Sequence, residues 1–227
     1  MSNLDQVEIL TFDCYGTLID WESGIRQVLG EIAARHGLNA PVDDLVREWE
    51  AVQFELISAA SFRRYHGILR DSLRQTFKRR GVSINPKEQD LLAEKIGGWQ
   101  PFPDARPILA KLKKHFPIAI LSNIDDDILA QTAPKLGIDF DELITSDQLL
   151  SYKPRPAHFQ RAIKAFEKPP ELFLHCAFGA KYDLKPAQDA GMLTAWVKRP
   201  GAIQETPTSV TAEVDGLTGL AQLLQIA

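Results

Sequence analysis

Apolar and polar positions follow two different rhythms along this chain. Residues 7–12 form a short apolar run of the kind that fills a buried strand, and this strand pattern does not return until residue 117. From there to the end of the chain, strand-like runs alternate with helical segments. Such alternation is typical of a parallel sheet that has helices on both faces.

The residues between the first two strands repeat their apolar side chains every three or four positions, which is the helical period. Helices are expected there at 25–36, 42–57, 65–80 and 87–96. Glycines and prolines in 97–103 then break the helical pattern. We therefore predict a helical cap domain, residues 18–100, inserted into a core domain formed by residues 1–17 and 101–227.

The core domain is predicted to be of the α/β class, with a Rossmann-like, doubly wound parallel sheet. Its further strands are expected at 117–121, 143–147, 172–177 and 193–197. Its helices are expected at 105–115, 126–136, 156–166, 186–190 and 217–226. In such a sheet, the carboxyl ends of the strands form the edge where ligands bind.

Polar residues follow four of these strands, so one edge of the sheet would gather them. They are Asp13 after the first strand, Ser122 and Asn123 after the second, Lys153 after the third and Asp183 after the fourth. A carboxylate at this edge can act as a covalent nucleophile, and the alternative for Asp13 is a cap of the next helix. The four signals together favour a catalytic site.

The lysine, hydroxyl and amide groups suit an anionic substrate. Lys153 supplies a positive charge that keeps Asp13 ionised, and its alternative is an ordinary solvated loop. Ser122 and Asn123 either bind carboxylate or phosphate oxygens or cap the following helix. Thr17 either binds the substrate or holds Asp13, and hydrogen bonding within the turn is its simpler role.

This chain resembles the haloacid dehalogenase-like hydrolase superfamily over nearly its whole length. The four motifs of that superfamily are a nucleophilic Asp, a Ser or Thr, a Lys and an acidic loop. The matching residues are Asp13, Ser122, Lys153 and Asp183. Residues 13–17, Asp-Cys-Tyr-Gly-Thr, resemble the L-2-haloacid dehalogenase (type II) branch, whose pattern is Asp-x-Tyr-Gly-Thr. Phosphatases of the superfamily usually carry a second Asp where Tyr15 stands, because a leaving alcohol needs a proton and a halide does not.

The resemblance implies a hydrolase in which Asp13 displaces halide from a short 2-haloalkanoate through a covalent ester, without a metal or other cofactor. In this branch the acid that matches Asp183 holds the lysine and activates water. Substrate contacts are expected from Tyr15, Thr17, Asn123, Arg63, Arg64 and Tyr182. A magnesium-dependent small-molecule phosphatase, with Asp13 and Asp183 as ligands of Mg²⁺, is the first alternative, and a catalytically silent binding module is the second.

The chain also departs from this branch. The Ser and Asn usual in the fourth motif are replaced by Phe178 and Ala180, and Glu50 stands where the cap carries a halide-binding arginine. A glutamate would repel halide and carboxylate alike. Arg63 and Arg64, at the start of the third helix, are a candidate replacement, and the alternative is two solvated arginines.

Composition narrows the class of protein. With 227 residues, 44% of them hydrophobic, the chain can bury one core and a small accessory domain. A net charge of −4 without a long basic run argues against nucleic acid as a partner. Cys14 and Cys176 indicate buried thiols in a reducing compartment, and no apolar run approaches the ~18 residues of a membrane helix. We therefore expect a cytoplasmic protein with a small anionic substrate and no membrane partner, and the resemblance alone implies a homodimer.

Overall fold

The computed structural model describes residues 3–59, 61–199 and 206–226. The chain divides into two compact units, one formed by Met1–Asp20 and Gln100–Ala227, the other by Trp21–Trp99. We call them the core unit and the helical unit. The predicted domain boundaries, 17/18 and 100/101, lie close to these divisions, and the role of the helical unit as a cap stays a prediction.

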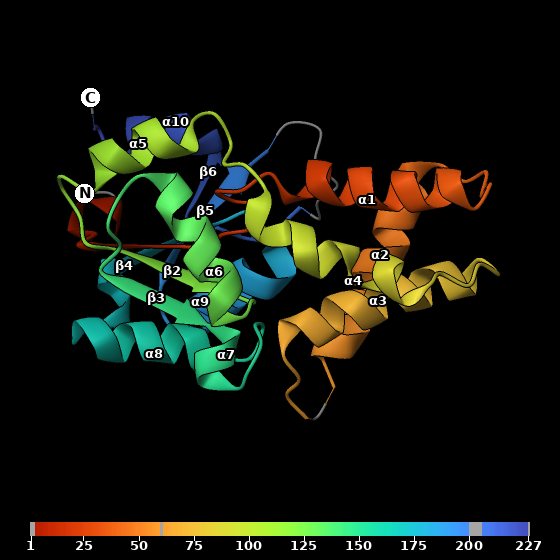
Figure 1. Cartoon of the computed structure of the whole chain (residues 1–227). Helices are drawn as coiled ribbons and strands as arrows, with labels where there is room; N and C mark the ends of the chain where they lie inside the picture. The colour runs from red at the N-terminus through yellow and green to blue at the C-terminus, as the bar shows by residue number, and fades with distance from the viewer. Residues whose placement is uncertain (1–2, 60, 200–205, 227) are drawn as a thin grey trace. The chain divides into compact units, whose positions relative to one another are not determined.

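A parallel sheet forms the centre of the core unit (Figure 1). Its strands within the described residues are β1 (Ile9–Phe12), β2 (Ile118–Ser122), β3 (Glu142–Thr145), β4 (Phe173–Ala177), β5 (Leu193–Lys198) and β6 (Ala212–Asp215). Their order is β3-β2-β1-β4-β5-β6, and every neighbouring pair is parallel. This arrangement confirms the predicted doubly wound α/β fold. The strand order reverses between β1 and β4, which is where folds of this kind bind ligands.

Helices cover both faces of this sheet. The described α-helices of the core unit are α5 (Ala105–Leu112), α6 (Asp126–Thr132), α7 (Ser146–Leu149), α8 (Ala157–Phe166), α9 (Lys185–Asp189) and α10 (Gly216–Leu223). In Figure 1, α5 and α10 pack together on one side of the sheet, and α8 packs against β2 and β3 on the other. Every residue of β1, β2 and β4 is buried as a result, and Phe159 and Phe173 belong to the apolar cluster beneath α8.

Several elements of the core unit differ from the prediction. Ser146 and Asp147, expected at the end of a strand, begin the short helix α7. The helix expected at 126–136 ends at Thr132 and continues as a 3₁₀ turn, Ala133–Leu136, because Pro134 has no amide hydrogen to extend the α-helix. The edge strand β6 was not predicted from the sequence. Val214 is its one buried residue, so this strand lacks the apolar run that marks the other strands.

The described part of the helical unit holds α1 (Trp21–Arg35), α2 (Val42–Ile57), α3 (Tyr65–Arg79) and α4 (Pro86–Lys95), which confirms the four predicted helices. A capping box starts α4, since the Asn85 side chain accepts the Glu88 N–H and the Glu88 carboxylate accepts the Asn85 N–H. Burial opposes ionisation of Glu88, but hydrogen bonds from Arg35, Asn85 and His36 lower its pKa to about 2. None of the described helices is long and apolar enough to cross a membrane.

Candidate functional site

Asp13 is the first residue after β1 and lies buried at the carboxyl end of the strand. Gly16, with a φ of 96°, lets the chain turn back sharply, so that Thr17 returns to the aspartate. The Thr17 hydroxyl donates to Asp13 Oδ2 at 2.9 Å and itself accepts the Phe178 N–H at 2.9 Å. Thr17 thus holds the Asp13 carboxylate, which is one of the two roles expected for it, and its contact with a substrate stays a prediction.

Lys153 joins Asp13 to Asp183. Its ammonium group donates to Asp13 Oδ1 at 3.0 Å, to Asp183 Oδ1 at 2.5 Å and to the carbonyl oxygen of Leu121 in β2 at 2.7 Å. The side chain is 1% exposed, so these three acceptors use all three ammonium hydrogens in place of water. The structure therefore brings together three residues that the sequence placed after separate strands.

These three charges determine one another's pKa values. Burial raises the pKa of Asp13, and the neighbouring Asp183 adds to the rise although Lys153 opposes it. Burial works against the charge on Lys153 too, but the two carboxylates raise its pKa. The pKa of Asp183 is lowered in spite of its burial, because Lys153 and His175 both stabilise its anion. The result is a firmly charged lysine and a firmly ionised Asp183.

Asp183 lies on a π-helical turn, Ala180–Leu184, that follows β4. Gly179 begins this turn without a side chain, and a Cβ there would stand 2.9 Å from Asp183 Oδ2. His175, within β4, places its Nε2 3.3 Å from Asp183 Oδ1 and its Nδ1 2.9 Å from the Thr11 hydroxyl in β1. Sequence reasoning missed His175, whose signal was a polar ring in a buried strand that must find hydrogen-bond partners.

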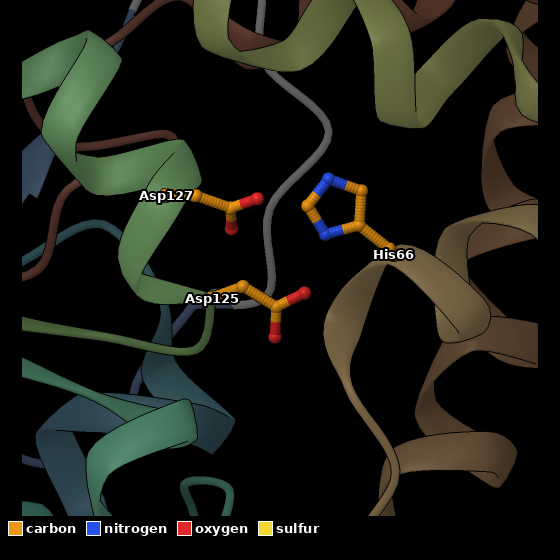
Figure 2. A group of neighbouring side chains, drawn as sticks. All are labelled: His66, Asp125 and Asp127. Carbon is orange, nitrogen blue, oxygen red and sulfur yellow. The ribbon is translucent and has the colours of Figure 1, made fainter.

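Ser122 and Asn123 lie at the carboxyl end of β2, and the N-cap of α6 is Asp125, so the structure does not bear out the alternative that they cap this helix. Figure 2 shows Asp125 and Asp127 at the start of α6. The Asn123 side chain instead holds the main chain of Lys153. Its Oδ1 accepts the Lys153 N–H at 2.7 Å, and its Nδ2 donates to the Lys153 carbonyl oxygen at 3.0 Å. Contact of Ser122 or Asn123 with a substrate stays a prediction.

The remaining predicted residues lie in two different units. In the core unit, the half-buried Tyr15 shares a 2.6 Å hydrogen bond with the Thr132 hydroxyl, and Tyr182 is half-buried on the π-helical turn. In the helical unit, Arg63 and Arg64 are exposed just before α3, and Arg63 forms an ion pair of 2.5 Å with Asp71. That these side chains bind a substrate anion stays a prediction.

Comparisons with known proteins agree on one family. A family model described as haloacid dehalogenase-like hydrolase matches residues 7–191. The chain is 25% identical to an (S)-2-haloacid dehalogenase of Pseudomonas sp. (strain YL), over 99% of this chain and 97% of that protein. It is 28% identical to (S)-2-haloacid dehalogenase 4A of Burkholderia cepacia, over 87% and 86%. The crystal structure of a defluorinating L-2-haloacid dehalogenase matches with a TM-score of 0.80 and 29% identity, over 96% of this chain and 95% of that one.

Proposed function

This chain belongs to the haloacid dehalogenase-like hydrolase family, and we propose that it is a 2-haloacid dehalogenase that replaces halide by hydroxyl on a short 2-haloalkanoate. The observation that carries the proposal is the Asp13 carboxylate, buried at the end of β1 against Lys153, with Tyr15 where phosphatases of the family usually have their proton donor. The relatives named as (S)-2-haloacid dehalogenases support the same reaction.

In the first step, a carboxylate oxygen of Asp13 attacks C2 of the substrate, the carbon–halogen bond breaks, and the halide leaves with the electron pair. The product is an ester between Asp13 and the substrate. Thr17 and Lys153 hold the two carboxylate oxygens in place for this attack, and the lysine charge offsets that of the substrate anion. A halide needs no proton, so this step does not require a general acid.

In the second step, water attacks the carbonyl carbon of the ester and passes a proton to Asp183. The bond between this carbon and the ester oxygen then breaks, and the leaving oxygen takes the proton from Asp183 to become the hydroxyl group of the 2-hydroxy acid. The Asp13 carboxyl group loses the second proton of the water and is again a carboxylate. Each turnover releases one halide ion and one proton. Because C2 is attacked once, from the side opposite the halogen, the product has the inverted configuration.

The experiment that tests this proposal measures halide release and product configuration with each enantiomer of 2-chloropropionate in the presence of EDTA. Asp13→Asn is the control, since it keeps the shape of the side chain and removes the nucleophile. We expect turnover of one enantiomer to the inverted hydroxy acid, and none in the control. Retained configuration, or halide release by the control, would exclude the ester mechanism.

Magnesium-dependent phosphate ester hydrolysis is the outcome that would favour the phosphatase alternative. That alternative needs Asp13 and Asp183 to direct oxygens at Mg²⁺. Lys153 already donates to Oδ1 of both carboxylates and Thr17 donates to Oδ2 of Asp13, so three of the four carboxylate oxygens already have donors. This donor set fits a lysine-bridged site better than a magnesium site. Phosphate release that stops on addition of EDTA, without any halide release, would reverse this preference.

A further inference from the structure

A buried chain of hydrogen bonds leads from Thr11 through His175 to Asp183. Thr11 in β1 and His175 in β4 are neighbours across the parallel sheet, and both side chains are fully buried. The Thr11 hydroxyl lies 2.9 Å from His175 Nδ1, and His175 Nε2 lies 3.3 Å from Asp183 Oδ1. The sheet register therefore fixes the imidazole between a hydroxyl and a carboxylate.

The partners of the ring determine where its hydrogens lie. A ring nitrogen that faces a carboxylate oxygen must carry hydrogen, because two lone pairs would repel each other, so Nε2 is a donor to Asp183. In the neutral imidazole Nδ1 is then an acceptor, and it takes the hydrogen of the Thr11 hydroxyl. The Phe159 ring and the imidazole pack edge to face, with ring centroids 5.2 Å apart, and this contact restrains the imidazole further.

The two oxygens of Asp183 have different surroundings. Within the described residues, the side-chain bonds to Asp183 come from Lys153 and His175 and converge on Oδ1. Oδ2 instead lies beside Gly179, where a Cβ would come within 2.9 Å of it. Two donors fix Oδ1, and the absence of a side chain at Gly179 leaves room for Oδ2, which is left to receive a proton.

We infer that His175 is a positioning residue, which orients Asp183 so that Oδ2 accepts the proton of the water that hydrolyses the Asp13 ester. The inference rests on the proposed function and extends it to a residue outside the four motifs. Thr11 supports the same arrangement, because its hydrogen bond to Nδ1 holds the ring in the orientation that points Nε2 at Asp183. The pKa of Asp183 agrees with this role, since the His175 hydrogen bond helps to lower it in spite of burial.

Two amide variants separate the two sides of the ring. In His175→Gln the side-chain nitrogen reaches about as far as Nε2 and can still donate to Asp183, whereas in His175→Asn the shorter side chain keeps only the Thr11 side. We expect kcat of His175→Asn to fall by about 10- to 100-fold at nearly unchanged KM, as for the loss of other groups that orient a catalytic ligand. His175→Gln should recover most of this loss.

Pre-steady-state kinetics identify the step that slows. If Asp183 serves ester hydrolysis, His175→Asn still completes the first step, so it should release a burst of one halide per protein before slow turnover. The ester should then accumulate, and the intact protein should gain the mass of the carboxyalkyl group on Asp13. A folded His175→Asn without burst or mass gain, or one that matches His175→Gln, would overturn the inference.

A third variant and an NMR measurement test the inference even if His175→Asn fails to fold. Thr11→Val keeps the shape of a strand residue and removes the hydroxyl, so it should lower kcat in the same direction by a smaller factor. In the wild-type protein, ¹⁵N NMR of the imidazole should show hydrogen on Nε2 and a bare Nδ1, and the opposite tautomer would overturn the inference without any activity measurement. A wild-type protein that turns over no haloacid would overturn the proposed function, which is a different result from normal turnover by His175→Asn.

Discussion

At the scale of single residues, the raised pKa of Asp13 determines how activity responds to pH. Burial raises this pKa above its ordinary value of 3.8, and the Asp183 anion adds to the rise. A nucleophile must be ionised, so kcat/KM for halide release should fall as the pH falls through the raised pKa. A pH–rate profile measures this limb, and an acid limb at or below 3.8 would contradict the raised value.

The same raised pKa means that ionised Asp13 lowers the stability of the folded protein. Between its ordinary and its raised pKa, the folded protein holds a proton that the unfolded chain has released, so the contribution of this group to stability is lost as the pH rises through that window. Asp13→Asn removes the buried charge, and we expect it to raise the melting temperature at neutral pH by a few degrees while it abolishes turnover. Asp139→Asn, at an exposed carboxylate, is the control and should change little. A lower melting temperature of Asp13→Asn would contradict this account.

Gly179 offers a test of the Asp183 carboxylate alone. A methyl group at this position would stand 2.9 Å from Oδ2, so the carboxylate must rotate or move away. We expect Gly179→Ala to lower kcat by roughly tenfold or more, with a small change in melting temperature. Gly30→Ala is a matched control, because its new Cβ would meet Val42 at an ordinary 3.6 Å. Equal kcat values for the two variants would show that the Asp183 position is not critical.

Sequence reasoning found the charged residues of the site and missed most of what holds them. Asp13, Lys153 and Asp183 were predictable because each follows a strand, and parallel strands end at one edge. The bond between Thr11 and His175 depends on the register of β1 against β4, between residues 164 positions apart. A register of this kind follows from packing of the whole sheet, which no local pattern encodes.

At the scale of elements, one arginine joins several segments of the core unit. Arg199, directly after β5, donates from Nε to the Thr17 carbonyl oxygen at 3.0 Å and makes two bonds to Asp104, of 2.8 and 2.9 Å. Asp104, directly before α5, also accepts the N–H of Leu217 in α10 at 2.7 Å. Through this arginine, β5, α5 and α10 are all tied to the turn that holds Asp13.

Removing this arginine should therefore destabilise the core unit. Arg199 has a side chain that is 4% exposed, and Arg199→Met would leave the Asp104 carboxylate without its cation and remove the donor to the Thr17 carbonyl oxygen, at a cost of about 3 kcal/mol in the free energy of unfolding. Arg199→Lys should recover less than half, because an ammonium group cannot bond both Asp104 oxygens and the Thr17 carbonyl as a planar guanidinium does. Urea titrations measure both values. Lys198→Met, at a half-exposed neighbour, should cost less than about 1 kcal/mol, and an equal cost for Arg199→Met would contradict the argument.

Elements with a strong apolar period were the most predictable. The helix α2 begins at Val42 and ends at Ile57, as its apolar spacing indicated. The strand β6 was not predicted, because an edge strand needs few apolar residues. Its pairing with β5, rather than an apolar run of its own, makes this segment a strand.

At the scale of the whole molecule, the helical unit is inserted where its two connecting segments run side by side. Ile19 and Pro101 form an antiparallel bridge, and the Asp20 N–H donates to the Gln100 carbonyl oxygen at 3.0 Å. Both residues of each pair belong to the core unit. The ends of the insertion thus start close together, and a short linker suffices to replace it.

We expect the core unit to fold without residues 21–99 when a short Gly-Ser linker joins Asp20 to Gln100, because its apolar cluster and the bonds around Lys153 lie within it. Urea unfolding should remain a single cooperative transition, and ¹⁵N NMR should show His175 in the same tautomer as in the full chain. Turnover should be lost, because the excised segment carries Arg63 and Arg64, the predicted ligands of the substrate anion. Full turnover by the shortened protein would exclude these arginines, whereas failure to fold would show that the core unit depends on the helical unit for its stability.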